Sequence, residues 1–218
     1  HRTGSIWKET PSKRSRIVSQ VCKKLEQTYG KPRLDNPNEP LDDLVYIIIS
    51  NKTPPDRADK LYQTLKATYK TWDDVLARGF KKLERVLKPG GLVKAKAPQM
   101  WAALEKVRAD FGECNLNVLK GYSELEAYNY LVSLPGVSKK VAKCVMMYTL
   151  DMNVLPVDSH VHRVSKRLGW TNKKEPRQAH EELEALVPPK LRYAFHVDCL
   201  VHGREICRPA RPLCSSCS

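Results

Sequence analysis

Helical periodicity is the feature of this sequence that most restricts its fold. Apolar residues recur at spacings of three and four in almost every segment, and no segment shows the sustained apolar–polar alternation of a half-buried strand. From Val18 to Tyr29 the apolar side chains fall on one helical face, and Gly30 is placed to end the helix. The sequence therefore predicts an all-α protein of about ten helices.

The run from Leu41 to Ile49 is ambiguous, because it is apolar nearly all round and could be a short strand or a buried helix. No partner strand is apparent elsewhere, so we interpret it as a helix buried among others. Further helical patterns cover residues 54–69, 72–77, 80–87, 95–111, 123–132, 138–150, 159–168, 177–186 and 189–202.

The charge of the chain favours a polyanionic partner. Lys and Arg number 38 against 24 Asp and Glu, which gives a net charge of +14. A basic surface binds nucleic acid because neutralised phosphates release their counterions. A merely soluble basic protein is an equally good interpretation of charge alone. No apolar run approaches the roughly 20 residues of a membrane span, and we expect no membrane partner.

Cysteine usage indicates a reducing environment. The seven cysteines are an odd number without regular spacing, unlike a secreted disulfide scaffold. Four of them lie singly in helical patterns, where a cysteine is usually a small buried hydrophobe. We therefore expect an intracellular protein of the cytoplasm or nucleoid, or of the nucleus in a eukaryote. The chain begins at His1, without a methionine, and we expect it to be a fragment or a processed form.

A tight turn separates two of the predicted helices at residues 134–140, which read LPGVSKK. Gly136 provides backbone freedom where a side chain would collide with an approaching ligand. Ser138 is suited to cap the second helix, whose first N–H groups carry a partial positive charge that can hold a phosphate. Lys139 and Lys143 are near enough to strengthen that field. An ordinary corner between two helices explains these residues, taken alone, equally well.

A second motif gives this turn a more specific meaning. Residues 157–164 read VDSHVHRV, so Asp158 follows Lys140 by eighteen positions. A Leu-Pro-Gly-Val hairpin followed by a Val-Asp-Ser-His helix start resembles the signature of the endonuclease III family, DNA glycosylases of the helix-hairpin-helix superfamily. Similarity continues through residues 91–97 and 202–204 and so spans most of the chain.

The resemblance implies a bifunctional enzyme, a DNA glycosylase with abasic-site lyase activity. Lys140 would be the attacking amine and Asp158 the catalytic carboxylate. An amine can attack the electron-poor sugar carbon, form a Schiff base and permit elimination of the 3′ phosphate. The start of a helix, with other cations nearby, lowers the pKa of such an amine. Without the resemblance, Lys140 is a solvated lysine and Asp158 a helix N-cap. Lys139 is the rival amine, rotated about 100° around the helix.

The DNA contacts also come from the resemblance. Such an enzyme must flip its target base and fill the gap, and Leu92 would be the wedge. Asn51 takes the position of a glutamine that enters the vacated stack, and because asparagine is shorter we expect recognition of the orphaned base to differ. A capped helix end is the alternative for Asn51. The predicted interface is completed by Gly136, Val137, Ser138, Lys139, Lys143 and His160, the last expected to be structural rather than catalytic.

Three cysteines crowd the end of the chain. Cys207, Cys214 and Cys217 match the first three ligands of the family's iron–sulfur loop, so the resemblance implies a [4Fe-4S] cluster. The pattern wants a fourth cysteine, which we expect beyond Ser218, with Cys199 as a substitute. Zinc and no metal at all are the alternatives. Arg204, Arg208 and Arg211 surround the loop and would face phosphate in any case.

The architecture implied by the resemblance has two helical lobes with DNA bound across their cleft. Residues 40–150 would form a six-helix barrel that carries the helix-hairpin-helix. Residues 1–39 and 151–218 would form a second lobe from the N-terminal helix, the C-terminal helices and the cysteine loop. The expected substrate is duplex DNA with a damaged base, an oxidised pyrimidine, or an abasic site, bound by a monomer. The rivals are a glycosylase specific for mismatched or otherwise altered bases, and a non-catalytic DNA-binding module.

Overall fold

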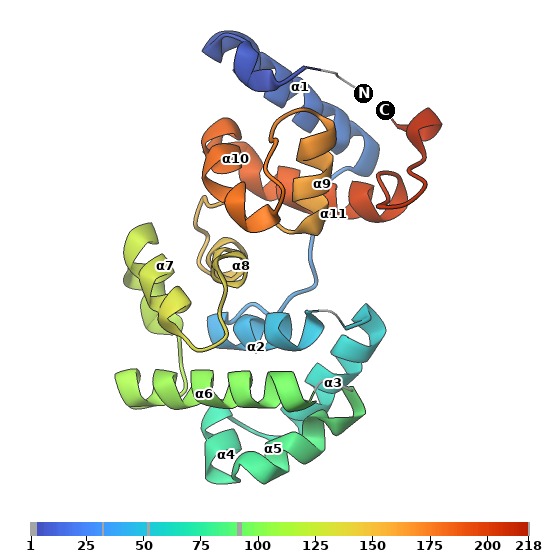
Figure 1. The fold of residues 1–218 in the computed structure, drawn as a ribbon. Helices are drawn as coiled ribbons and strands as arrows, with labels where there is room; N and C mark the ends of the chain where they lie inside the picture. The colour runs from blue at the N-terminus through green and yellow to red at the C-terminus, as the bar shows by residue number, and fades with distance from the viewer. Residues whose placement is uncertain (1–3, 32, 52, 91–92, 218) are drawn as a thin grey trace. The chain divides into compact units, whose positions relative to one another are not determined.

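The computed structural model describes residues 4–31, 33–51, 53–90 and 93–217. Within these ranges every regular element is helical, with eleven α-helices, six short 3-10 helices and no strand (Figure 1). The all-α prediction is confirmed. The ambiguous run from Leu41 to Ile49 lies in helix α2 (Pro40–Ser50), so its helical interpretation was correct.

The chain divides into two units by its internal contacts. Residues 36–152 form the first, which we call the hairpin unit, and residues 1–35 with 153–218 form the second, the terminal unit. Besides α2, the helices of the hairpin unit are α3 (Pro55–Thr68), α4 (Trp72–Ala77), α5 (Phe80–Leu87), α6 (Val93–Phe111), α7 (Glu124–Ser133) and α8 (Lys139–Thr149). Those of the terminal unit are α1 (Pro11–Tyr29), α9 (Ser159–Arg167), α10 (His180–Leu186) and α11 (Arg192–Glu205).

Helix α2 lies at the centre of the hairpin unit, where it packs against α3, α6 and α8. Its apolar composition explains this position, because Leu44 and Ile49 are both fully buried. Pro40 and Pro55 stand at the first positions of α2 and α3, where the missing N–H costs nothing. Helix α8, which follows the predicted hairpin, packs against both α2 and α7.

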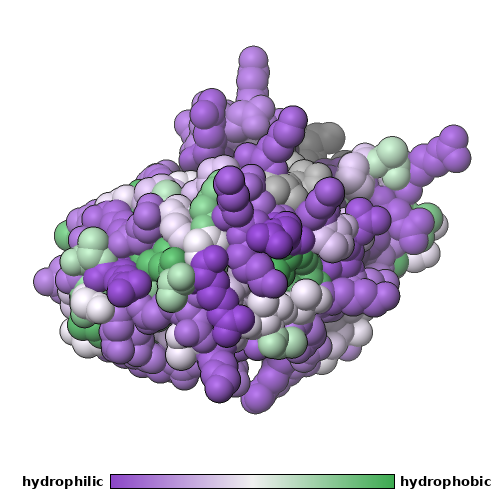
Figure 2. All heavy atoms as spheres, turned by 90° about the horizontal axis from the view of Figure 1, so that it is seen from below, coloured by the Kyte–Doolittle hydropathy of each residue, from purple (hydrophilic) through white to green (hydrophobic). Residues whose placement is uncertain are grey.

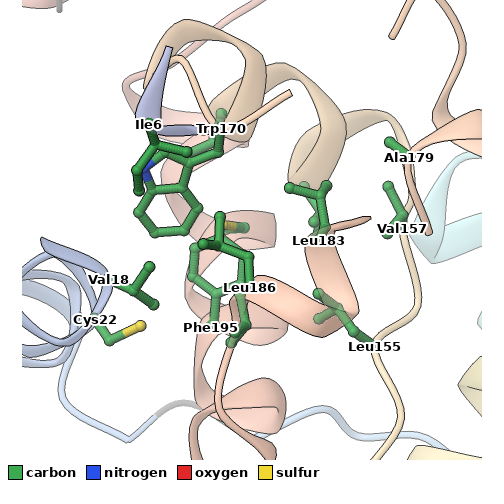
Figure 3. Packing of buried hydrophobic residues seen from close by; sticks show 14 of the residues in the cluster. Ile6, Val18, Cys22, Leu155, Val157, Trp170, Ala179, Leu183, Leu186 and Phe195 are labelled. Atoms are coloured by element: carbon green, nitrogen blue, oxygen red, sulfur yellow. The ribbon is translucent and has the colours of Figure 1, made fainter. Parts of the chain in front are cut away.

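Helix α11 organises the terminal unit through its contacts with α1 and α9. Trp170 and Phe195 stack in the core of this unit, with their ring centroids 5.3 Å apart. Val18 and Cys22 of α1 belong to the same core (Figure 3). Side chains from the first 25 residues therefore share one core with those of residues 155–199. The N-terminal helix and the C-terminal helices fold together, as the fold prediction required.

The molecule presents a mostly hydrophilic face. On the face seen in Figure 2, hydrophilic side chains predominate and hydrophobic ones are scattered between them. In the described ranges, no helix has the length and apolar composition that crossing a membrane requires.

Candidate active site and DNA-binding elements

The hairpin between α7 and α8 has the geometry that its sequence predicts. Gly136 has a φ of +77°, a conformation that other residues rarely adopt. A Cβ at this glycine would also lie 2.8 Å from Cγ of Gln99, which belongs to α6. Ser138 is the N-cap of α8, and its hydroxyl accepts a hydrogen bond from the Val141 N–H at 3.4 Å. The glycine is thus required by the turn and by the approach of α6.

The lysines of the hairpin differ in exposure. Lys139 and Lys140 are half-buried in the first turn of α8, which begins at Lys139, so burial does not separate the two amines. Lys143 is 8% exposed and lies on the inner side of the helix. Val137 is equally buried at 8%, and its N–H donates to the Leu134 carbonyl at 3.1 Å.

Lys140 lies close to a buried carboxyl of its own unit. Burial raises the pKa of Asp43 to about 7, and the hydrogen bond from the Asn36 amide and the charge of Lys140 partly offset that rise. The Asn36 amide donates to Oδ1 of Asp43 at 2.6 Å, while Oδ2 is buried without a hydrogen bond in the described structure. Lys140 is therefore within electrostatic range of a buried carboxyl group.

Asp158 is the N-cap of α9, as its sequence position predicts. Its Oδ1 accepts hydrogen bonds from the N–H groups of His160 and Val161 at 2.9 and 2.8 Å. Both bonds fall on the same oxygen, and within the described ranges no hydrogen bond to Oδ2 is found. The side chain is half-buried and its orientation is fixed by the helix it caps. Capping and a catalytic role are therefore compatible in this carboxylate.

His160 packs between α9 and α11. Its Nδ1 lies 3.1 Å from a guanidinium nitrogen of Arg163, which also donates to the Gly203 carbonyl at 2.9 Å. A Cβ at Gly203 would lie 2.6 Å from Nδ1 of His160, so this glycine lets the two helices approach. Burial lowers the pKa of His160. The surroundings of His160 fit the structural role that we expected.

Asn51 follows α2 as its C-cap, with its N–H donating to the Ile47 carbonyl at 3.1 Å. Its side chain is exposed. It thus combines the alternative interpretation, a capped helix end, with a side chain that a partner molecule can reach. Leu92, the predicted wedge, lies outside the described residues.

The C-terminal loop is held by arginine. Nη1 of Arg167 donates to Sγ of Cys207 at 3.1 Å and to the Arg208 carbonyl at 2.9 Å. Sγ of Cys217 lies 3.8 Å from Nε2 of His202, and Cys214 is exposed.

These thiols do not form a ready cluster site. Among the described residues, no group of three or more potential metal ligands comes together. Cys199, the suggested substitute ligand, is fully buried in the apolar core, where burial raises the pKa of its thiol. The four cysteines expected to be buried, Cys22, Cys114, Cys144 and Cys199, are all buried. The arrangement as it stands does not fit a four-thiolate cluster.

Within the described part of the hairpin unit, two buried charged residues were not predicted from the sequence. Asp43 is fully buried and Lys96 is 7% exposed. Asp43 stands in the first turn of α2, where an acidic residue normally serves the helix dipole at the surface. Lys96 stands in the KAKA repeat of residues 94–97, where nothing distinguishes it from Lys94. In one sequence no signal marks either residue as buried.

Comparison with known proteins gives these elements their context. Residues 45–189 match the model of the HhH-GPD superfamily of base excision DNA repair proteins, a range that includes both Lys140 and Asp158. One relative is an Arabidopsis thaliana protein that is named as a candidate DNA glycosylase. It is 34% identical over 81% of this chain, and the match covers 58% of that protein's length. Endonuclease III of Thermotoga maritima is 27% identical over 92% of this chain and 89% of its own.

Solved structures agree on the fold. An endonuclease III in a non-covalent complex with DNA superposes with a TM-score of 0.80 at 22% identity, covering 93% of this chain and 92% of the other. A thermostable thymine-DNA glycosylase gives 0.77 at 21% identity, covering 96% and 95%. At such identities the likeness establishes the fold, while the family model establishes descent. The chain belongs to the HhH-GPD superfamily of base excision DNA repair proteins.

Proposed function

We propose that this protein is a DNA glycosylase that also cleaves abasic sites, with Lys140 as its nucleophile. The observation that carries the proposal is that one family match spans both a lysine in the first turn after a glycine hairpin and an aspartate that caps the next helix. Neither residue is diagnostic alone. In this family context they supply the amine and the carboxylate that the reaction needs.

The proposed reaction begins with the neutral amine of Lys140. Its nitrogen attacks C1′ of the flipped nucleotide, the N-glycosidic bond breaks, and the bonding electrons leave with the base. Loss of a proton from the nitrogen and opening of the sugar ring give a Schiff base. Removal of a proton from C2′ then expels the 3′ phosphate, and water hydrolyses the Schiff base to free the amine.

Asp158 would act as a fixed anion in this sequence. A carboxylate stabilises the positive charge that develops on the sugar, and it can accept the proton that the attacking amine loses. Because Oδ1 is occupied by the two N–H groups of α9, we assign this work to Oδ2. The cap gives the carboxylate a fixed direction at no further cost.

The hairpin would hold the DNA backbone. The capped start of α8 offers N–H groups and a partial positive charge to a phosphate, and Lys139 adds a formal charge. We keep Gly136, Val137, Ser138, Lys143 and His160 as proposed members of the interface. Because Val137 and Lys143 are buried, we propose that they contribute to the interface by shaping the hairpin.

Borohydride trapping on abasic-site DNA tests the proposal. We expect the wild-type chain to become covalently attached, and Lys140→Gln to lose attachment while retaining affinity for the DNA. Lys139→Gln is the matched control. It removes the charge of the neighbouring lysine, which is also half-buried, and this variant should still be trapped. Attachment of Lys140→Gln at the wild-type rate would transfer the role to another amine. A wild-type chain that binds DNA but is never trapped would indicate a binding module.

The lesion is the finer question. We propose oxidised pyrimidines, because relatives named endonuclease III match most of this chain. The exposed Asn51 keeps open a preference for mismatched or otherwise altered bases. A panel of duplexes with single defined lesions decides between them: oxidised pyrimidines should be excised fastest, and faster excision of mismatched thymine would favour the rival.

The iron–sulfur prediction remains to be tested by chemistry. The three C-terminal thiols are not gathered as one ligand group, so we route no step of the reaction through a cluster. Iron and sulfide analysis of a longer chain that extends past Ser218, purified without oxygen, tests the prediction, and a colourless, iron-free product would overturn it. We also propose that the protein acts as a monomer in a reducing compartment.

A further inference from the structure

A buried ammonium group reaches the turn that carries Asn51. Lys96 stands in the first turns of α6 and is 7% exposed. Its Nζ donates to the carbonyls of Ile49 and Asn51, the latter at 2.7 Å, and to Oγ1 of Thr53 at 2.7 Å. An ammonium has three donors, and here each has an acceptor. All three acceptors belong to the end of α2 and the residues directly after it.

Ending a helix with a buried ammonium group is energetically unfavourable compared with the usual caps. Burying an ammonium carries a large desolvation penalty, whereas the last carbonyls of most helices are satisfied by a glycine cap or by water. Burial lowers the pKa of Lys96 to about 8, which still leaves the group mostly protonated and able to donate all three bonds at neutral pH. Its three hydrogen bonds tie Ile49, Asn51 and Thr53 to α6.

The segment it fixes presents one polar side chain outward. The backbone of Asn51 is bound on both sides, through its N–H to Ile47 and through its carbonyl to Lys96. Its side chain is exposed, and no hydrogen bond of its amide is found within the described residues. The result is a rigid main chain with a side-chain amide available to a partner.

We propose that Lys96 is a positioning residue, which holds the turn at Asn51 so that the asparagine amide meets the base opposite the lesion. This inference rests on the proposed function and on the role that the family resemblance implies for Asn51, which is to enter the space left by the flipped nucleotide. Lys96 itself touches no DNA. It acts through Asn51, so its effect should appear only when an opposite base is present.

The test compares single-turnover excision from two duplexes, one with a normal base opposite the lesion and one with an abasic analogue there. The ratio of the two rates measures the use of the opposite base. We expect the wild-type ratio to be about tenfold, the value of one good hydrogen-bonded contact, and Lys96→Met to reduce it to within about twofold. Thr53→Val removes one acceptor and should give an intermediate ratio. Lys94→Met removes an exposed charge from the same helix and should keep the wild-type ratio.

A double-mutant comparison separates positioning from general damage. In an Asn51→Ala background, Lys96→Met should cause no further fall in the ratio, because the group it positions is gone. A wild-type ratio near one, an unchanged ratio in Lys96→Met, or additive losses in the double variant would each overturn the inference. Trapping of the wild-type chain on single-stranded abasic DNA, which has no opposite base, tests the proposed function separately. If the wild-type chain is trapped on single-stranded DNA but the ratio test gives one of the contradicting results, the proposed function stands and the positioning role of Lys96 is rejected.

Discussion

At the scale of single residues, Asp43 shows how burial changes an ordinary side chain. Its carboxyl is fully buried, and among the described residues one oxygen has a single donor and the other has none. Desolvation raises its pKa to about 7. Such a group binds its proton more tightly in the folded state than in the unfolded chain, so it stabilises the fold only while it remains protonated.

The sign of the pH effect follows from that shift. The contribution of Asp43 is full below its unfolded pKa and is lost as pH rises toward about 7. Between pH values of about 5 and 8 this loss amounts to about 2 kcal/mol. Asp43→Asn has no such titration, so we expect its unfolding free energy to change less over this range than that of the wild type. Urea unfolding of both proteins at the two pH values measures the difference. An equal change in unfolding free energy with pH in the wild type and in Asp43→Asn would contradict this explanation.

The residue scale also marks the limit of prediction from sequence. The N-cap roles of Ser138 and Asp158 could be predicted because capping is local and is decided by the next three residues. The acceptors of Lys96 lie 43 to 47 positions away in the chain, so no local pattern contains them. The roles proposed for Lys140 and Asp158 likewise depend on a resemblance and not on any property of the two residues alone.

At the scale of elements, helix type and position were largely predictable. The apolar spacing that defines α1, α3 and α11 is a property of continuous segments. Local signals also mark both ends of α1, which is capped by Thr10 and ends at Gly30, and the start of α3 at Pro55. Predicting α2 as a helix needed an additional argument, because nearly all positions from Leu41 to Ile49 are apolar. That argument was that no partner strand is apparent in the sequence. What spacing could not predict is which helices pack together, such as α2 against α8.

The hairpin provides a test at this scale. Gly136→Ala places a Cβ at a positive φ and close to Gln99, so we expect a loss of about 1–2 kcal/mol in unfolding free energy. Adding Gln99→Ala removes the contact but not the backbone strain. The double variant should therefore recover only part of the loss. Full recovery would mean that the conformation of Gly136 carries no constraint, and no loss in the single variant would contradict the described turn.

At the scale of the whole molecule, the net charge of +14 predicts how binding depends on salt. Each neutralised phosphate releases counterions, so affinity for duplex DNA should fall steeply and linearly on a double-logarithmic plot. For a protein that neutralises a few phosphates, raising monovalent salt from about 50 to 200 mM should weaken binding at least tenfold. Fluorescence anisotropy with undamaged duplex measures the slope. An affinity independent of salt would mean that the basic surface does not meet the DNA backbone.

The most direct test of the central claim is to identify the atom that bonds to the sugar. After borohydride reduction on abasic-site DNA, nuclease and protease digestion leave one peptide that carries a sugar remnant, and tandem mass spectrometry locates it. The account predicts the remnant on Nζ of Lys140. A remnant on Lys139, on another lysine or on the amino terminus would contradict it.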